Sequence, residues 1–160
     1  LIDNVSKNGY MLLNIGPKPD GTIPEEDKNL LEGIGNWLDV NGEAIFETET
    51  WDQYGEGPTK MNEAGPFSDN RVKLIYTAKD FRFTTKDNFL YATALGWPSK
   101  DFTIESIYKL FDNEIERVEL LGSTDKVEWK HTRDGLHITR PDNKPCEHAY
   151  SFKITRKEYL

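Results

Sequence analysis

The second half of the chain is built from short runs in which apolar and polar residues alternate, the pattern of strands that bury one face. Seven or so such runs follow residue 80, and turn-forming segments of a few residues separate them. The first run opens with Phe81 and Phe83, and the others cover residues 89–97, 103–107, 115–121, 127–131, 136–139 and 150–155. Short strands at this spacing are typical of an antiparallel β-sandwich. We therefore expect a mainly β fold.

The last run shows the alternation most clearly. Phe152 and Ile154 are apolar, whereas Ser151 and Lys153 are polar. Side chains of a strand point alternately to its two faces, so this pattern predicts one face in the core and one face in solvent. Residues 133–135 (Arg-Asp-Gly) have the chemistry of a hairpin turn between two earlier strands.

The N-terminal part of the chain has a different organisation. Residues 10–15 form a nearly continuous apolar run, which is typical of a strand buried on both faces in a parallel sheet. Gly16 and Pro17 end that run, because glycine frees the backbone and proline removes a hydrogen-bond donor. A helix is expected from Pro24, since proline suits the first helical position and apolar residues recur at helical spacing over residues 30–38. Together these residues predict the strand–loop–helix unit of an α/β protein.

Between these two parts lies a segment with little periodicity that is rich in Gly, Pro, Asp, Asn and Glu. Such a composition is typical of a linker. We therefore divide the chain into an α/β part at residues 1–50, a linker at residues 51–70 and a β-sandwich at residues 71–160. Within the first part, residues 1–7 are expected to be the end of a helix, and residues 43–50 are expected to be extended.

Charge and composition narrow the range of partners. The net charge is −8, and the 28 acidic and 20 basic residues are dispersed along the chain. No basic stripe is present, which argues against binding to nucleic acid or to an anionic membrane. No run of about 18 apolar residues occurs, so no segment is expected to span a membrane. The single cysteine, Cys146, excludes an internal disulfide and a cysteine-built metal site.

Several segments carry a resemblance. Residues 6–26 have the sequence SKNGYMLLNIGPKPDGTIPEE, and residues 34–51 have the sequence IGNWLDVNGEAIFETETW. Four later segments follow, which are YGEGPTK, DFRFTTKDNFLYATALGWP, IERVELLG and VEWKHTRDGLHITRP. In this order they resemble the α-L-fucosidases of glycoside hydrolase family 29, over nearly the whole chain. The succession of LLNIGP, DGTIPEE and NGEAI is the most specific part of the resemblance.

The resemblance implies a fold and a reaction. The fold would be the last strand–loop–helix unit of a (β/α)8 barrel, followed by a C-terminal antiparallel β-sandwich. The reaction would be the retaining hydrolysis of terminal α-L-fucosides, without a metal or an organic cofactor. The substrate, a fucosylated glycan, would bind through the barrel. The family also implies an extracellular, periplasmic or lysosomal-type compartment.

The catalytic groups of this family are not expected in this chain. Retaining glycosidases use two carboxyl groups about 5 Å apart, one as nucleophile and one as acid/base. The resemblance implies that these groups come from earlier barrel segments, which would precede Leu1. Nothing in the sequence matches those segments, so no catalytic residue is assigned. The 160 residues alone are expected to be inactive.

The loop after the expected barrel strand is the part of an active site that this chain would hold. Active sites of (β/α)8 barrels lie at the C-terminal ends of the strands. Asn14, Gly16 and Pro17 are therefore candidates for supporting the floor of the pocket. The alternative, which we favour, is that these residues only shape the turn.

Three carboxylates near this loop have simpler roles. Asp20 precedes Gly21 in a turn, and Glu25 and Glu26 lie at the positive end of the expected helix dipole. We therefore expect a turn-forming residue and two helix-stabilising residues rather than catalytic groups.

The histidines and the cysteine suggest no reactive site. His131, His137 and His148 fall in or beside expected strands, and Cys146 lies near the last of them. A zinc site needs converging ligands, for which this set gives only a weak signal. A nucleophile pair of Cys146 and His148 would lack an apparent third group to orient it. We assign no metal ligand and no nucleophile.

Aromatic residues offer a competing function. Phe89, Tyr91 and Trp97 share one face of their run by parity, and Trp129 lies on another run. Sugar rings stack on exposed aromatic faces, so Tyr91, Trp97 and Trp129 are candidates for binding carbohydrate. The alternative, which we favour, is packing in the core or between domains, because aromatic side chains bury large areas and Leu90 and its neighbours make the opposite face apolar as well.

Two functions therefore stay open. The first is the C-terminal segment of an α-L-fucosidase-like hydrolase, in which the sandwich stabilises the barrel. The second is a non-catalytic carbohydrate-binding or interaction module. The first predicts an exposed apolar surface on residues 1–42, with self-association through it. The second predicts exposed Trp and Tyr side chains on one face of the sandwich.

Overall fold

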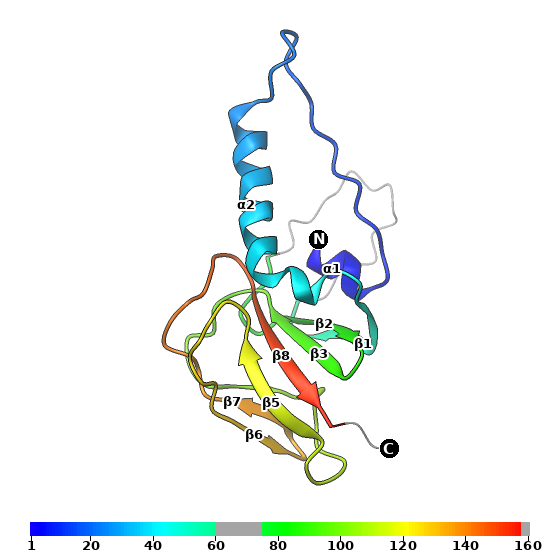
Figure 1. The fold of residues 1–160 in the computed structure, drawn as a ribbon, viewed down its shortest axis with the longest axis vertical. Coiled ribbons are helices and arrows are strands. Elements are labelled where there is room, and N and C mark those ends of the chain that lie inside the picture. The colour runs from blue at the N-terminus through cyan, green and yellow to red at the C-terminus, as the bar shows by residue number, and fades with distance from the viewer. Residues whose placement is uncertain (60–74, 158–160) are drawn as a thin grey trace.

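Two antiparallel sheets face each other, and a small group of helices covers the outer face of the larger sheet (Figure 1). The computed structural model describes residues 1–59 and 75–157. The larger sheet has the strand order β1-β2-β3-β8-β5, and the smaller sheet has the order β4-β7-β6. The strands are β1 (Glu49–Glu56), β2 (Phe81–Lys86), β3 (Phe89–Ala94), β4 (Phe102–Ile104), β5 (Ile115–Leu120), β6 (Trp129–Thr132), β7 (Gly135–Ile138) and β8 (Tyr150–Arg156). The predicted mainly β fold with an antiparallel sandwich is confirmed.

The main core lies between the two sheets. Phe102 of β4 connects them, because its ring stacks on Phe81 at 5.6 Å and meets Phe152 edge-on at 5.4 Å between ring centroids. Alternate residues of the larger sheet point into this core, as the period of two requires. Fully buried members of the core include Phe83, Leu90, Ala92, Ala94, Phe152 and Ile154 from the larger sheet and Ile104, Leu136 and Ile138 from the smaller sheet.

Two hairpin turns fix the register of neighbouring strands. Asp87 joins β2 to β3 with φ 53°, a conformation that Asp tolerates better than most residues. Gly135 begins β7 with φ 135°, and a Cβ there would lie 2.5 Å from the carbonyl oxygen of Ile104. Only glycine fits that position, as the turn chemistry of residues 133–135 indicates.

The outer face of β8 is largely covered rather than solvated, which corrects the expectation for the last run. Ser151 is fully buried, although its polar side chain lies on the face opposite Phe152. The helices α1 (Ile2–Ser6) and α2 (Glu25–Asn41) and the short 3-10 helix η1 (Gly42–Ala44) supply the covering. We call α1 together with residues 37–45 the helical layer. The parity of the strand is therefore as predicted, but a second layer, rather than water, meets the polar face.

Helix α2 forms where the sequence predicts it. It starts after Pro24, with acidic residues in its first turn, and is followed by Gly42. Its C-terminal end reaches the sheet, whereas its N-terminal half projects away from the sandwich (Figure 1). Within residues 1–59 and 75–157, no helix combines the length and the apolar character needed to cross a lipid bilayer.

The strand expected at residues 10–15 is not formed. The segment runs extended beside α2 and makes no ladder with any described strand (Figure 1). Tyr10 is 99% exposed and Leu12 is 93% exposed. A strand needs hydrogen-bonded neighbours, and in a parallel sheet these come from other strand–helix units. The sequence pattern therefore identifies a segment with strand character whose partners are not among the described residues.

The segment between the two parts differs from expectation. Residues 43–50 were expected to be extended, but they begin with η1 and a turn, and β1 starts only at Glu49. Strand β1 then continues to Glu56, so the first residues of the predicted linker at 51–70 belong to the larger sheet. Residues 60–70 of that linker lie outside the described residues.

Candidate functional site

The candidate pocket-support residues lie at the far end of the projection. Asn14, Gly16 and Pro17 are exposed. Their segment, residues 14–17, continues the extended chain toward the tip of the projection (Figure 1). There the chain reverses in a tight turn, in which the Lys18 N–H donates to the Thr22 carbonyl at 2.8 Å. No cavity is formed around Gly16, since nothing lies within 4 Å of where its Cβ would be. The hydrogen bonds described for this loop lie within its own turn.

Asp20 is the turn-forming residue that the sequence predicts. Its Oδ1 accepts hydrogen bonds from the Thr22 N–H at 3.0 Å and from the Thr22 hydroxyl at 2.7 Å. These bonds lower the pKa of the Asp20 carboxyl, which favours the ionised form. Glu25 and Glu26 lie in the first turn of α2, where their charges stabilise the helix.

The described carboxyl groups whose pKa is clearly shifted are shifted downward, the opposite of what a glycosidase acid needs. Burial alone would raise the pKa of several, but hydrogen bonds and neighbouring cations hold these groups below their ordinary values. Among the described residues, the carboxyl groups with a lowered pKa are Asp3, Asp20, Glu43, Glu47, Asp80 and Asp112. Each is a fixed charge at neutral pH rather than a proton donor.

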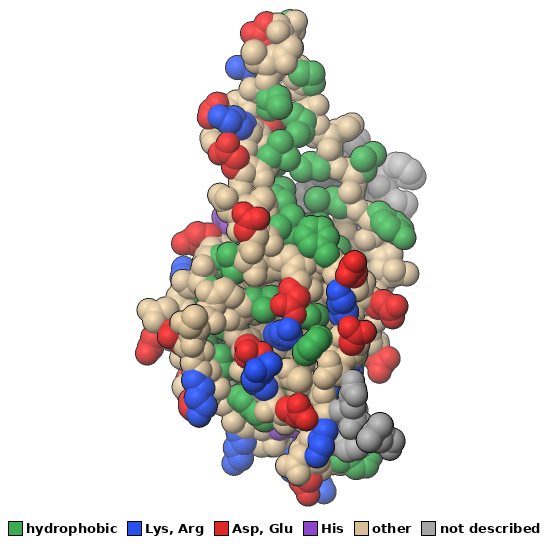
Figure 2. Space-filling model, in the orientation of Figure 1, with side chains coloured by type: hydrophobic (Ala, Val, Ile, Leu, Met, Phe, Trp, Pro, Cys, Tyr) green, Lys and Arg blue, Asp and Glu red, His purple; other side chains and the backbone are tan. Residues whose placement is uncertain are grey.

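The projection carries an exposed apolar surface. Figure 2 shows hydrophobic side chains along the projecting helix and the extended segment beside it. We call this set the apolar strip, and it consists of Tyr10, Met11, Leu12, Leu13, Ile23 and Leu30, all exposed. Apolar side chains gathered in this way on a protein surface mark a site that another surface covers. The surface predicted for residues 1–42 is therefore present.

The base of α2 is fastened to the sandwich by buried polar contacts. The Trp37 indole N–H donates to the Ala149 carbonyl at 2.8 Å. The Asn41 side chain is fully buried, and its Oδ1 accepts the Ser151 N–H at 3.2 Å. Gly122 touches the same helix, since a Cβ there would lie 2.4 Å from Cγ1 of Val40. These contacts fix the end of the helix against β8 and the turn after β5.

Glu43 extends this junction across the larger sheet. The Tyr91 hydroxyl donates to Glu43 Oε1 at 2.8 Å, and the Lys153 ammonium pairs with the same oxygen. Burial and the hydrogen bond to Glu43 raise the pKa of Tyr91 far above its ordinary value, so the phenol stays protonated. Nearby, the Thr84 hydroxyl donates to the Ala44 carbonyl at 2.8 Å. Polar residues from three strands therefore meet η1.

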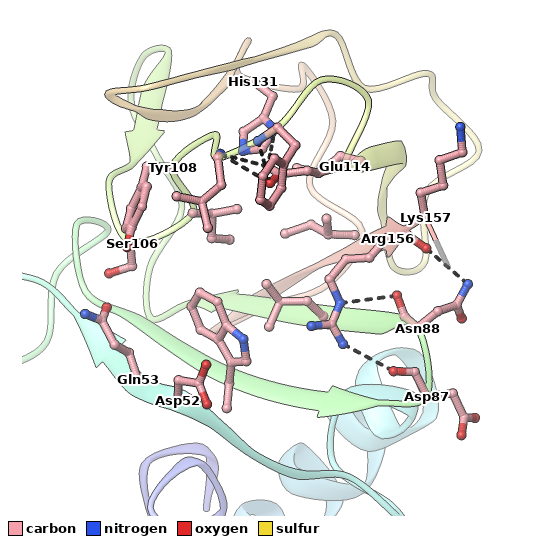
Figure 3. A pocket seen from close by; sticks show the side chains of 17 residues that line it. Asp52, Gln53, Asp87, Asn88, Ser106, Tyr108, Glu114, His131, Arg156 and Lys157 are labelled. Atoms are coloured by element: carbon pink, nitrogen blue, oxygen red, sulfur yellow. Dashed lines mark hydrogen bonds and ion pairs between the residues drawn. The ribbon is translucent and has the colours of Figure 1, made fainter. Parts of the chain in front are cut away.

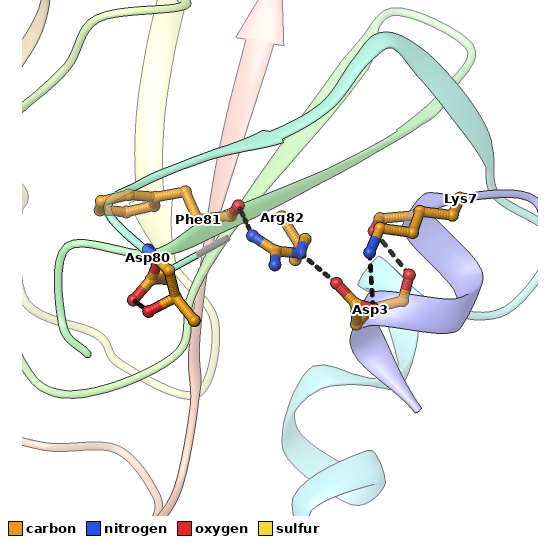
Figure 4. A network of polar contacts seen from close by, with 7 residues as sticks. Asp3, Lys7, Asp80, Phe81 and Arg82 are labelled. Carbon is orange, nitrogen blue, oxygen red and sulfur yellow. Dashed lines mark hydrogen bonds and ion pairs between the residues drawn. The ribbon is translucent and has the colours of Figure 1, made fainter. Parts of the chain in front are cut away.

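A charged cluster joins α1 to β2 (Figure 4). Arg82 Nε donates to Asp3 Oδ1 at 2.5 Å, and Lys7 Nζ lies 2.8 Å from Asp3 Oδ2. The guanidinium of Arg82 also lies over the rings of Tyr54 and Tyr76, at 5.7 and 5.2 Å from their centroids. Burial alone would raise the pKa of Asp3, but its hydrogen bonds with Lys7 and Arg82 hold that pKa below the ordinary value. An ion pair thus connects the helical layer to the sheet.

The sequence did not single out these contacts. Strand parity could have indicated Arg82, because it lies between Phe81 and Phe83 and must point away from the core. No local pattern could have paired it with Asp3, 79 residues away. Local pattern could likewise not pair Asn41 with Ser151 or Glu43 with Lys153, because each of these pairs is 110 residues apart.

The candidate sugar-stacking residues pack inside the molecule to different degrees. Tyr91 is fully buried and faces the helical layer. Trp97 does not share its face, because β3 ends at Ala94 and the Trp97 ring packs edge-on against Tyr150 at 4.6 Å. Trp129 is partly buried and packs against the main core. This burial favours the packing alternative, most clearly for Tyr91.

The histidines and Cys146 are not gathered into one site. His137 lies between the hydroxyls of Thr103 and Thr132, at 2.8 and 2.9 Å. Burial lowers the pKa of His131 and raises the pKa of the Cys146 thiol. Within the ranges 1–59 and 75–157, no three His, Cys, Asp or Glu side chains are placed to hold a metal ion.

Comparison with known proteins identifies the family to which this chain is similar. The family model for alpha-L-fucosidase matches residues 1–43, and the model for the alpha-L-fucosidase C-terminal domain matches residues 73–155. The plasma alpha-L-fucosidase of Pongo abelii is 31% identical over 97% of this chain and 30% of its own length. The tissue alpha-L-fucosidase of Rattus norvegicus is 30% identical over 98% of this chain and 30% of its own length.

A solved structure agrees with these relatives. The crystal structure of a Thermotoga maritima alpha-fucosidase in complex with fucose superposes with a TM-score of 0.70 at 29% sequence identity. The match covers 96% of this chain and 32% of that chain. This chain thus spans about a third of the length of the fucosidases it matches. The two models match in the order of the N-terminal segment and the sandwich, and the model of the C-terminal domain covers more than half of the chain, so the chain belongs to the α-L-fucosidase family as a C-terminal part.

Proposed function

We propose that this chain is the C-terminal segment of an α-L-fucosidase that hydrolyses terminal α-linked L-fucose from fucosylated glycans with retention of configuration. In this proposal the rest of a (β/α)8 barrel supplies the nucleophile and the acid/base, and the present chain supplies the closing strand–loop–helix unit and the sandwich. The observation that carries the proposal is the apolar strip, which lies on the segment matched by the fucosidase model. Residues 10–15 and helix α2 would then be covered by neighbouring barrel units.

The chemistry of the described carboxylates supports the assignment of catalysis to other segments. A retaining glycosidase needs one carboxylate and one carboxylic acid with a raised pKa at neutral pH. The clearly shifted carboxyl groups of the described residues all have lowered pKa values, and most are held by cations or by turn hydrogen bonds. We infer that the 160 residues alone do not hydrolyse a fucoside.

Asn14, Gly16 and Pro17 would have a supporting role in the complete barrel. Their loop follows the segment with strand character, and active sites of such barrels lie at that end of the strands. Under this proposal the loop lines a pocket only when the barrel packs around it. Stacking of a sugar on Tyr91, Trp97 or Trp129 stays a prediction. It would need exposed rings, whereas Tyr91 is buried and both tryptophans pack against core residues.

The sandwich would stabilise the barrel through the helical layer. The bonds from Trp37 to Ala149 and from Ser151 to Asn41 bury polar groups at this junction, where a missing partner is costly. The division of the chain into a barrel part (1–50), a linker (51–70) and a sandwich (71–160) stays a prediction. Strand β1 (Glu49–Glu56) crosses the first of these boundaries and belongs to the larger sheet of the sandwich. The function of the sandwich is then to hold the last barrel helix in place.

Hydrolysis of a chromogenic α-L-fucoside tests the proposal. The assay compares this chain with the same chain extended at its N-terminus to a whole barrel. We expect turnover only by the extended protein, with the released aglycone measured by absorbance. Turnover by the 160 residues would contradict the assignment of the catalytic groups to other segments. An extended, folded protein that hydrolyses no fucoside would contradict the proposed reaction.

A further inference from the structure

A hollow of about 670 Å³ opens at one end of the sandwich (Figure 3). Its floor comes from both sides of the main core, with Leu90 and Ile154 from the larger sheet and Ile107 from the loop after β4. Trp51 in β1 also lines it. The volume lies within the range typical of small-ligand sites. The hollow is therefore large enough for one or two sugar rings.

Exposed aromatic and aliphatic side chains form one rim of the hollow. Tyr108 is 52% exposed, Phe111 is 66% exposed, and Leu110 beside them is exposed as well. These three residues belong to one loop between β4 and β5. An aromatic ring that remains accessible beside an apolar floor offers a flat surface for the apolar face of a ring-shaped ligand.

Polar groups face the hollow around this apolar surface. Arg156 is fixed, since its guanidinium donates to the Thr85 hydroxyl at 2.9 Å and to the Asp87 carbonyl at 3.2 Å. Among the described residues, the side chains of Gln53 and Ser106 and the Tyr108 hydroxyl have no hydrogen-bond partner, and in Figure 3 all three lie on the same side. A few polar groups beside an apolar lining are what orients a small ligand.

The charges around the hollow nearly balance. Asp52, Asp87 and Glu114 contribute three acidic groups, and Arg156 and Lys157 contribute two basic groups. A site for an anion or a cation would present one dominant sign. This lining instead suits an uncharged ligand with hydroxyl groups on one edge and apolar surface on the other.

The hollow lies on the opposite side of the larger sheet from the helical layer. Leu90 and Ile154, which line it, point into the space between the sheets, whereas their neighbours Tyr91 and Thr155 point the other way. In Figure 3 the helices lie beyond the sheet from the hollow. Packing of barrel units on the apolar strip would therefore leave the hollow open.

We propose that this hollow binds a fucosyl unit of a glycan. For the identity of the sugar this inference rests on the proposed function. Fucose is an uncharged ring with hydroxyl groups and a methyl group in place of the usual hydroxymethyl group. The methyl group and the apolar ring face would lie against Trp51, Tyr108 and Phe111, and the hydroxyls would bond to Gln53 and Ser106. The sandwich would then hold substrate glycans near the barrel.

Titration of the nitrogen-15-labelled chain followed by two-dimensional NMR tests the proposal. The two probes are methyl α-L-fucoside and methyl α-L-galactoside, which differ only by a hydroxyl group on the sixth carbon. We expect saturable shifts at the Trp51 indole N–H and at the backbone N–H groups of residues 106–114, with a millimolar Kd for the fucoside. The galactoside should bind at least about five-fold more weakly than the fucoside, because its extra hydroxyl meets an apolar floor.

Substitutions at the exposed rim test the same site with little risk to folding. Phe111→Ala should weaken fucoside binding about five-fold or more, and Gln53→Ala should weaken it to a smaller degree. Phe46→Ala is the matched control, because Phe46 is an exposed phenylalanine in the turn after η1. The control should bind the fucoside with unchanged affinity.

Three results would overturn the inference. They are the absence of saturable shifts at these positions, equal affinity for the two probes, and equal weakening by Phe111→Ala and Phe46→Ala. None of them bears on hydrolysis, because the binding assay uses the 160 residues without a complete barrel. Turnover by the extended protein without binding here would reject only the hollow. Binding here without turnover by the extended protein would reject only the proposed reaction.

Discussion

The indole N–H of Trp37 donates a hydrogen bond of 2.8 Å to the carbonyl of Ala149, 112 residues away in the sequence. Trp37 lies in the last turns of α2, and Ala149 immediately precedes β8, so the bond joins the strand–loop–helix segment to the sandwich. Both residues are buried, and they pack in a small apolar cluster with Ile45. This junction is therefore part of the folded core rather than a flexible connection.

Trp37→Phe should destabilise the chain by about 1–3 kcal/mol. The phenyl ring keeps much of the apolar contact but removes the N–H, which leaves the buried Ala149 carbonyl with only the weak thiol donor of Cys146, at 3.3 Å. The free energy of unfolding is measured by urea denaturation followed by far-ultraviolet circular dichroism. A variant as stable as the original chain would show that water replaces the lost donor at no cost.

Asp3→Asn should destabilise the chain by about 2–3 kcal/mol at neutral pH, because Arg82 is buried and would lose its charged partner. The folded-state pKa of Asp3 lies below the ordinary value of 3.8, so its stabilising contribution is complete above that pH. The contribution is lost as the pH falls through the lower folded-state pKa. The difference in unfolding free energy between the two proteins should therefore shrink below pH 3.8.

Asp112→Asn is the control for that measurement. Asp112 also forms an ion pair, with Lys109 at 2.5 Å, but its side chain is largely exposed. Exposed ion pairs contribute little to stability, so this variant should unfold almost like the original chain. Similar losses for both variants would mean that the cluster in Figure 4 has no special role.

Gly122→Ala should destabilise the chain by about 1–3 kcal/mol. Gly122 has φ 77°, and a Cβ would lie 2.4 Å from Cγ1 of Val40 in α2. Gly35→Ala should have the opposite effect, because nothing lies within 4 Å of its Cβ position and alanine favours a helix by up to about 1 kcal/mol. Thermal denaturation of the two variants measures the difference. Equal shifts in the same direction would contradict the close contact between α2 and the turn after β5.

The apolar strip should cause the 160 residues to self-associate. The double variant Leu12→Lys and Leu30→Lys places two charges on the strip and should raise the concentration needed for association about ten-fold or more. Ile75→Lys is the matched control, since Ile75 is an exposed aliphatic residue outside the strip. Sedimentation velocity over a range of concentrations measures the association. An equal effect of the control would show that net charge, rather than the strip, governs it.

Strands whose partners are present in the chain could be predicted from the sequence. The run from Phe81 and the run at residues 150–155 form β2 and β8, as their alternation predicts. Both strands form because described residues pack on each of their faces. The expected strand at residues 10–15 is not formed for the opposite reason, since no described strand pairs with it. An apolar run therefore indicates strand character without showing that a partner strand is present.

Strand β1 was missed because its sequence resembles a loop. It contains Gly55, where a Cβ would lie 2.3 Å from the Phe81 carbonyl oxygen, and its register shifts between Thr50 and Gly55. The strand is nevertheless fixed by Trp51, whose ring meets Phe83 edge-on at 5.2 Å. An edge strand with an irregular register has few alternating residues, so periodicity could not reveal it.

The polar junction and the hollow depend on distant parts of the chain. Asn41 could be recognised as a helix-ending residue, but its bond to Ser151 follows from the packing of α2 on β8. The exposed Tyr108 and Phe111 could not be distinguished from core aromatics by sequence, because their loop has no periodic pattern. The hollow appears only when this loop meets β1 and the end of β8.

The last strand of the chain, β8, lies between β3 and β5 in the larger sheet. During synthesis on the ribosome, β3 and β5 therefore emerge before the strand that pairs with both of them. Until residues 150–156 are released, these two strands have free edges that face each other and expose apolar side chains. The sheet closes in a final insertion, and with it comes the carbonyl that Trp37 needs. A nascent chain that stalls before this point would be a substrate for chaperones rather than a smaller folded protein.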